Sequence, residues 1–172
     1  EMQDSGYQDV DYVLTTRELG RMISEAGIDF TSLPDGKQDS PMGMSTGAAD
    51  IFANTGGVME AAIRTVYEVV TGRELPMENL HIGPIVGLEG VKEAKLKIEK
   101  PLPDWDFLDG AELNVAVAHG LGNAAKVLEA IASGKADYHF VEVMTCPGGC
   151  IGGGGQPRYT DNAVRQARIN AI

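Results

Sequence analysis

The sequence predicts an α/β protein with a mainly parallel sheet and flanking helices. Residues 112–144 read as strand, helix and strand with short connections, which favours parallel pairing through a right-handed crossover. Elsewhere in the chain, apolar residues at helical spacing alternate with strand patterns. The length of 172 residues is that of about one ordinary domain, so residues 1–172 are expected to form a single unit.

The N-terminal segment contains a predicted strand followed by a predicted helix. Residues 10–15 (VDYVLT) have the apolar composition of a short buried strand. Thr15 and Glu18 form a capping-box signature, and apolar residues then recur at helical spacing up to Gly27, a suitable C-cap. The polar, turn-rich residues 33–41 (LPDGKQDSP) predict a surface loop.

The middle of the chain predicts one helix and one edge strand. Valine and alanine residues at helical spacing follow the Gly56–Gly57 pair and stop before Gly72. Residues 91–98 (VKEAKLKI) alternate apolar and charged side chains. This alternation is typical of a strand with one solvated face, and we expect it at a sheet edge.

The last third of the chain predicts the strand–helix–strand unit and a closing helix. The strands are residues 112–119 and 138–144, and the helix between them is residues 124–133. We expect Asn123 to cap this helix by accepting from its first free amides. A second helix is expected from Asp161 to the end of the chain.

The charge balance excludes several classes of partner. The chain has 14 basic and 25 acidic residues, for a net charge of −11, so it has no basic field for nucleic acid or for an anionic membrane surface. No apolar run approaches the roughly 20 residues needed for membrane insertion. The first residues, EMQDSGYQDV, lack the pattern of a secretory signal. We therefore expect a cytoplasmic protein, with a periplasmic location as the alternative.

Two cysteines, Cys146 and Cys150, lie in a glycine-rich segment. Six of the eight residues 148–155 are glycine, which would let a bulky ligand approach the backbone closely. Thiolates bind soft metals and iron–sulfur clusters, but both usually need four ligands. The alternative is a pair of ordinary thiols in a flexible loop, able to form a strained local disulfide.

Three histidines are candidates to complete a metal site: His81, His119 and His139. His119 lies at the end of one predicted strand and His139 lies within another. A hydrogen-bonded structural histidine is the more usual outcome in such places, and none of the three is assigned as a ligand.

A turn with the sequence GLGNAA favours a different function. Gly120 and Gly122 follow a strand and precede a helix, as in dinucleotide-binding proteins. However, the third small residue is Ala125, and the acid of the next strand, Glu142, lies inside that strand rather than at its end. The sequence therefore indicates a tight strand-to-helix turn, with nucleotide binding as the alternative.

Residues 41–65 (PMGMSTGAADIFANTGGVMEAAIRT) and 142–158 (EVMTCPGGCIGGGGQPR) closely resemble two signature segments of the catalytic domain of iron-only hydrogenases. The resemblance extends to residues 9–23 and 87–98, so it covers nearly the whole chain. It implies an α/β fold forming the C-terminal lobe of a two-lobed catalytic domain.

The resemblance also implies a cofactor, the H-cluster, in which a four-iron cubane shares one cysteine sulfur with a diiron centre. Cys146 and Cys150 would be two of the four cubane ligands, and Cys150 would be the shared, catalytic one. Met144 would line the diiron pocket, with Met42 and Gly43 on its other side. In many family members phenylalanine stands where this chain has Met42, which implies a modest change in pocket shape.

In this family the other two cubane cysteines, the proton-delivering cysteine and a pocket lysine lie upstream of the matching region. The chain is therefore expected to be a fragment that is inactive and free of metal when isolated. Its expected partners are the N-terminal lobe and accessory iron–sulfur domains of the same enzyme, and a ferredoxin-like or other electron carrier. Two alternatives are a related iron–sulfur cluster assembly protein and a nucleotide-binding module using Gly120 and Gly122.

Overall fold

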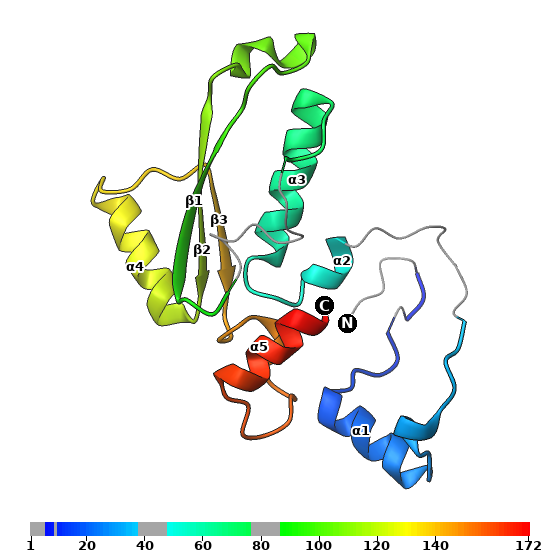
Figure 1. Cartoon of the computed structure of the whole chain (residues 1–172). Coiled ribbons are helices and arrows are strands. Elements are labelled where there is room, and N and C mark those ends of the chain that lie inside the picture. Colours follow the sequence, from blue (N-terminus) through cyan, green and yellow to red (C-terminus); the bar gives the residue numbers. More distant parts are fainter. Residues whose placement is uncertain (1–5, 9, 38–47, 77–86) are drawn as a thin grey trace.

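The computed structural model describes residues 6–8, 10–37, 48–76 and 87–172. Its centre is a sheet of three strands in the order β1 (Val91–Lys97), β2 (Glu112–His119) and β3 (Phe140–Met144). Helix α3 (Gly57–Thr71) lies on one side of this sheet and α4 (Leu121–Ala132) on the other (Figure 1). The α/β class with flanking helices is therefore confirmed, and β1 lies at an edge of the described sheet as predicted.

The described sheet is mixed rather than mainly parallel. Strands β2 and β3 are parallel, with Val115 opposite Phe140 and His119 opposite Met144, because α4 provides the crossover between them. Strand β1 pairs with β2 in the antiparallel sense. The connection from β1 to β2 contains only a short 3-10 helix, Pro103–Leu108, and a chain that turns back without a crossover enters the sheet antiparallel.

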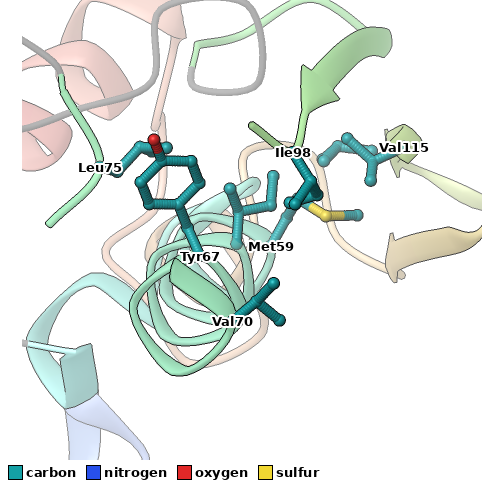
Figure 2. Close-up of a cluster of buried hydrophobic side chains, with 8 residues drawn as sticks. Met59, Tyr67, Val70, Leu75, Ile98 and Val115 are labelled. Carbon is teal, nitrogen blue, oxygen red and sulfur yellow. The ribbon is translucent and has the colours of Figure 1, made fainter. Parts of the chain in front are cut away.

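Alternate residues of β2 divide the core into two clusters. Val115 and Val117 pack with the α3 side chains Met59, Ile63 and Tyr67. Figure 2 shows Met59, Tyr67 and Val70 of α3 gathered with Leu75, Ile98 and Val115. Ala116 and Ala118 point to the opposite face and pack with Ala124 and Val127 of α4. The central strand is therefore buried on both faces.

The helix ends follow the sequence signals, with one exception. Helix α3 is bounded by Gly56 and Gly72, both at positive φ, and the closing helix α5 (Asn162–Ala171) has Asp161 as its N-cap. Helix α4 begins at Leu121, with Gly120 as its N-cap. The prediction for Asn123 is wrong, since its side-chain amide donates to the carbonyl of His119 at 2.8 Å instead of accepting from the helix.

The N-terminal helix forms as predicted, but the strand before it does not. Helix α1 (Thr16–Glu25) begins with the complete capping box of Thr15 and Glu18, and Gly27, just past its end, has a φ of +69°. Residues 10–15 pair with no strand of the described chain, and Tyr12 and Val13 are 87% and 85% exposed. A lone segment cannot satisfy its backbone as a strand, so the pattern alone was insufficient.

The remaining described elements are short. Helix α2 spans Ala48–Ile51, and two 3-10 helices span Phe30–Ser32 and Cys150–Gly152. Residues 33–37 have no regular structure, in keeping with the predicted loop, whose other residues lie outside the described ranges. Within those ranges, no helix has both the length and the apolar composition needed to cross a bilayer.

Candidate metal centre

The two cysteines lie in a tight loop directly after β3, residues 146–150, called here the cysteine loop. Both are free thiols; Cys146 is half-buried and Cys150 is exposed. The amide of Gly149 donates to the carbonyl of Cys146 at 3.0 Å, which closes the loop into a turn. Cys150 begins the 3-10 helix Cys150–Gly152. The thiols thus stand at the two ends of one turn at the carboxyl end of a parallel strand, where ligands bind in such sheets.

The cysteine loop packs against the turn before α3. The amide of Thr55 donates to the carbonyl of Gly148 at 3.0 Å, and Asn54 forms an isolated antiparallel bridge with Gly149. The amide of Ile151 donates to the carbonyl of Ala53 at 3.3 Å. The two segments singled out in the sequence, residues 41–65 and 142–158, therefore meet in space through their described parts.

Two glycines near the thiols, one in the cysteine loop and one just after it, have different surroundings. Gly149 has a φ of +89°, and a Cβ there would lie 2.8 Å from both the Ala53 carbonyl and the Thr55 amide. The chain's own packing therefore explains this glycine. At Gly153 a Cβ would lie 3.4 Å from the Cys146 sulfur, so its absence leaves the thiol open on that side.

A buried carboxylate connects the strand that carries the loop to α3. Glu142 of β3 accepts from the backbone amides of Gly56 at 2.6 Å and Met59 at 2.7 Å. These are free donors at the start of the helix, where negative charge is favoured. Glu142 therefore holds α3. A dinucleotide site would need an acid from this strand, and Glu142 is not available for that role.

A buried ammonium group lies behind the same turn. Lys92 is 4% exposed, and its Nζ lies 2.9 Å from the Gly87 carbonyl and 3.3 Å from the Thr55 hydroxyl. Burial lowers the pKa of Lys92 to about 8, while the negative charges of Glu142 and Glu89 act in the opposite direction. Lys92 therefore supports the turn at Thr55, and Glu142 supports the start of α3 directly after it.

Asn54, in the same turn, has a buried side chain without a partner. It is 1% exposed, and neither its Nδ2 nor its Oδ1 has a hydrogen bond. A buried amide without a partner costs about 1–3 kcal/mol. Its backbone is bridged to Gly149 of the cysteine loop, so a residue with an unused donor and acceptor contacts the loop through its main chain.

The histidines provide no further ligand among the described residues. His119 accepts from the Gly148 amide and His139 accepts from the Asn114 amide, each through Nδ1, so both are the structural histidines that the sequence favoured. Within the described ranges, no three histidine, cysteine or acidic side chains gather in one place. His81 lies outside those ranges.

The other predicted site residues that the structure describes lie at the end of β3 and at the start of α4. Met144 is the last residue of β3 and is half-buried, two positions before Cys146. Met42 and Gly43 lie outside the described residues. Gly120 caps α4, and its amide donates to the Met144 carbonyl at 2.8 Å, so the GLGNAA turn ties α4 to β3.

Sequence reasoning missed Thr55, Asn54 and Lys92 as residues that support the loop, and it missed the contact that the structural His119 makes with the loop. One signal was present for Lys92, since it shares strand parity with Ala94 and Leu96 and therefore lies on the apolar face of β1. The other three contact the loop over separations of 29 positions for His119 and about ninety for the turn, which no local pattern reveals.

The chain is similar to known hydrogenase sequences over most of its length. The family described as iron only hydrogenase large subunit, C-terminal domain, matches residues 1–154. The periplasmic Fe hydrogenase large subunit of Nitratidesulfovibrio vulgaris is 49% identical over 157 residues, which are 91% of this chain and 34% of that protein. This chain therefore spans about a third of that relative.

A solved hydrogenase structure is also similar to this chain, and a more distant relative is an iron–sulfur assembly protein. An apo variant of the FeFe-hydrogenase HydA1 from Chlamydomonas reinhardtii has a TM-score of 0.74 and 43% identity, covering 98% of this chain and 46% of that one. The cytosolic iron-sulfur assembly component 3 of Pongo abelii is 29% identical over 171 residues, 95% of this chain and 33% of that protein. The similarity to hydrogenases is thus clearly the stronger.

Proposed function

The chain belongs to the iron-only hydrogenase large subunit family, as its C-terminal domain, and from this premise we propose that it forms one side of an H-cluster site in a longer enzyme. That enzyme would catalyse the reversible oxidation of molecular hydrogen to protons and electrons. The observation that carries the proposal is the loop of two free thiols held against the turn before α3. A solved FeFe-hydrogenase related to this chain is described with an H-cluster that has a 2Fe subcluster.

The described residues fit half of such a site. Cys146 and Cys150 supply thiolates, which are the usual protein ligands of a four-iron cluster. The absent side chain at Gly153 leaves the Cys146 sulfur open, and the buried Asn54 amide has no partner. When bound, an H-cluster supplies the iron site at which hydrogen, protons and electrons interconvert.

In this proposal each residue of the chain has a limited task. Cys146 and Cys150 would bind the cubane, and Cys150 would be the catalytic ligand that it shares with the diiron centre. Met144, Met42 and Gly43 are the residues that would line the diiron pocket. The turn at residues 53–55 fixes the loop, Lys92 holds this turn, and Glu142 holds the start of α3 that follows it.

The rest of the enzyme is proposed to cover the N-terminal part of this chain. The exposed apolar side chains of this part come from the unpaired segment and from α1; they are Tyr12, Val13, Leu14, Leu19 and Met22. An N-terminal lobe packing here would bury them and bring the remaining cubane ligands. Accessory iron–sulfur domains and a ferredoxin-like or other electron carrier complete the proposed partners. The relative from Nitratidesulfovibrio vulgaris is named as periplasmic, so cytoplasm and periplasm are both compatible with the proposal.

The test uses the full-length protein, produced with the maturation factors that build H-clusters. We expect an infrared spectrum with carbonyl and cyanide bands, and hydrogen evolution from a reduced dye. Cys150→Ser should remove both, because the shared sulfur is the only protein bond to the diiron centre. Thr145→Ser, at the exposed position just before Cys146, is the matched control and should retain both.

Two outcomes count against the proposal. Bands and activity that survive in Cys150→Ser would show that Cys150 is not the shared ligand. A full-length protein that holds a four-iron cluster but never shows carbonyl and cyanide bands would instead be an assembly protein, the second candidate favoured by the more distant relatives.

A further inference from the structure

His119 contacts the cysteine loop at its centre. The side chain is 7% exposed, and its Nδ1 accepts a hydrogen bond from the amide of Gly148 at 2.7 Å. Its Nε2 lies 3.0 Å from the Glu89 carbonyl and 3.3 Å from the Leu88 carbonyl. Because Nδ1 accepts, the ring proton is on Nε2, and Nε2 donates to these carbonyls. The imidazole therefore bridges the segment before β1 and the cysteine loop.

Gly148 is held on both sides of its backbone. While its amide donates to His119, its carbonyl accepts from the Thr55 amide at 3.0 Å. Gly148 is buried, with a φ of +83°, and stands midway between the two cysteines. The two bonds thus fix the peptide groups on both sides of the Gly148 Cα, two positions from each cysteine.

We propose that His119 is a positioning residue that sets the geometry of the Cys146 and Cys150 thiolates through the Gly148 amide. The role in cluster binding rests on the proposed function, whereas the effect on the two thiols does not. Without the imidazole acceptor, the loop would lose a fixed point, and preorganised ligands bind a metal more tightly than ligands that must be ordered. The freed Gly148 amide would also become available to a nearby sulfur, and hydrogen bonds to cluster sulfurs shift the reduction potential.

Two substitutions test the roles of the two ring nitrogens of His119 one at a time. In His119→Asn, Oδ1 occupies nearly the place of Nδ1 and can accept from Gly148, whereas the bond to Glu89 is lost. In His119→Gln, the longer amide reaches the place of Nε2 and can donate to Glu89, but it offers Gly148 no acceptor. The proposal therefore requires the asparagine variant to have the metal affinity and reduction potential of the wild type. The glutamine variant should have those of His119→Ala.

His139 provides a matched control. Its Nδ1 likewise accepts a hydrogen bond from a backbone amide, in this case that of Asn114 in β2, at 3.0 Å. Asn114 lies near the start of β2, whereas His119 is its last residue. His139→Gln thus removes the same kind of bond from the same strand, away from the cysteine loop, and should leave every thiol and cluster measurement unchanged.

The first measurement needs no iron. Cd²⁺ alone is titrated into the metal-free, reduced full-length protein, and thiolate binding is followed by its ultraviolet charge-transfer band. We expect affinity to fall about tenfold in His119→Gln and His119→Ala, the effect of losing about one hydrogen bond, and to stay at the wild-type level in His119→Asn. The proposal would be overturned if His119→Gln bound Cd²⁺ as tightly as the wild type. It would also be overturned if His119→Asn bound Cd²⁺ as weakly as His119→Ala.

The second measurement uses the four-iron cluster of the full-length protein. The glutamine and alanine variants should shift its reduction potential to more positive values, because the freed amide donates to sulfur, while the asparagine and His139 variants should not. A potential unchanged in all variants would overturn the proposal, since a merely structural histidine alters stability alone. A wild-type protein that binds no cluster would contradict the proposed function, yet the Cd²⁺ series would still decide the role of His119.

Discussion

Glu142 Oε2 lies 2.7 Å from the amide nitrogen of Met59, although 83 positions separate the two residues in the chain. The strand that leads to the cysteine loop is therefore joined directly to the start of α3. Met59 is fully buried in the main core cluster. This contact therefore connects the strand before the loop to the core. The site is held in place by a buried carboxylate as well as by apolar packing.

Replacing Glu142 by glutamine should lower the free energy of unfolding by about 2 kcal/mol, because both amides lose a charged acceptor and one of them then faces an NH2 donor. Urea denaturation of the chain measures the change. Glu112→Gln is the control: Glu112 forms an exposed ion pair with Lys95, and its loss should change stability by about 0.5 kcal/mol or less. Equal effects of the two substitutions would show that Glu142 does not hold α3.

Lys92 should make stability depend on pH. Its pKa of about 8 lies below the usual 10.5, so the unfolded chain binds more protons than the folded one between these values, and stability rises with pH there. Between pH 7.5 and 9.5 we expect a gain of about 1 kcal/mol, after allowance for solvent screening. The measurement is the difference in urea stability between wild type and Lys92→Met, which lacks this titration. A difference that does not change with pH would contradict the burial of the charge.

The unpaired Asn54 amide should weaken the metal-free chain. Asn54→Leu has a similar shape without polar atoms, and we expect it to raise the free energy of unfolding by about 1 kcal/mol. Thermal denaturation measures the effect, with Asn170→Leu on the exposed side of α5 as a control that should change little. A loss of stability in Asn54→Leu would mean that the amide has a partner in solution.

The isolated 172-residue chain should neither evolve hydrogen from a reduced dye nor hold a complete four-iron cluster. It contains two cysteines, whereas such a cluster usually has four protein ligands. Iron and sulfide analysis after anaerobic reconstitution tests the second statement. Stoichiometric four-iron cluster in the isolated chain would show that the site needs no second lobe.

Local features of this protein were predictable from the sequence wherever neighbours in the chain decide them. The Thr15–Glu18 capping box and the glycines that bound α3 depend on backbone groups a few positions away. The predicted strand at residues 10–15 failed because a strand requires a partner, and the described chain offers it none. The antiparallel entry of β1 was missed for a similar reason, since pairing direction depends on how the connection folds.

The sequence was sufficient to identify the two thiols and the family, because both lie in contiguous segments with specific residues. It did not reveal that Gly148 is held by His119 on one side and by Thr55 on the other, nor that Glu142 caps α3. These contacts join separate parts of the chain, and they exist only once the sheet places the end of β2, the turn at residues 53–55 and the cysteine loop side by side. A hydrogen bond depends on distance and direction in space, which the order of residues does not specify.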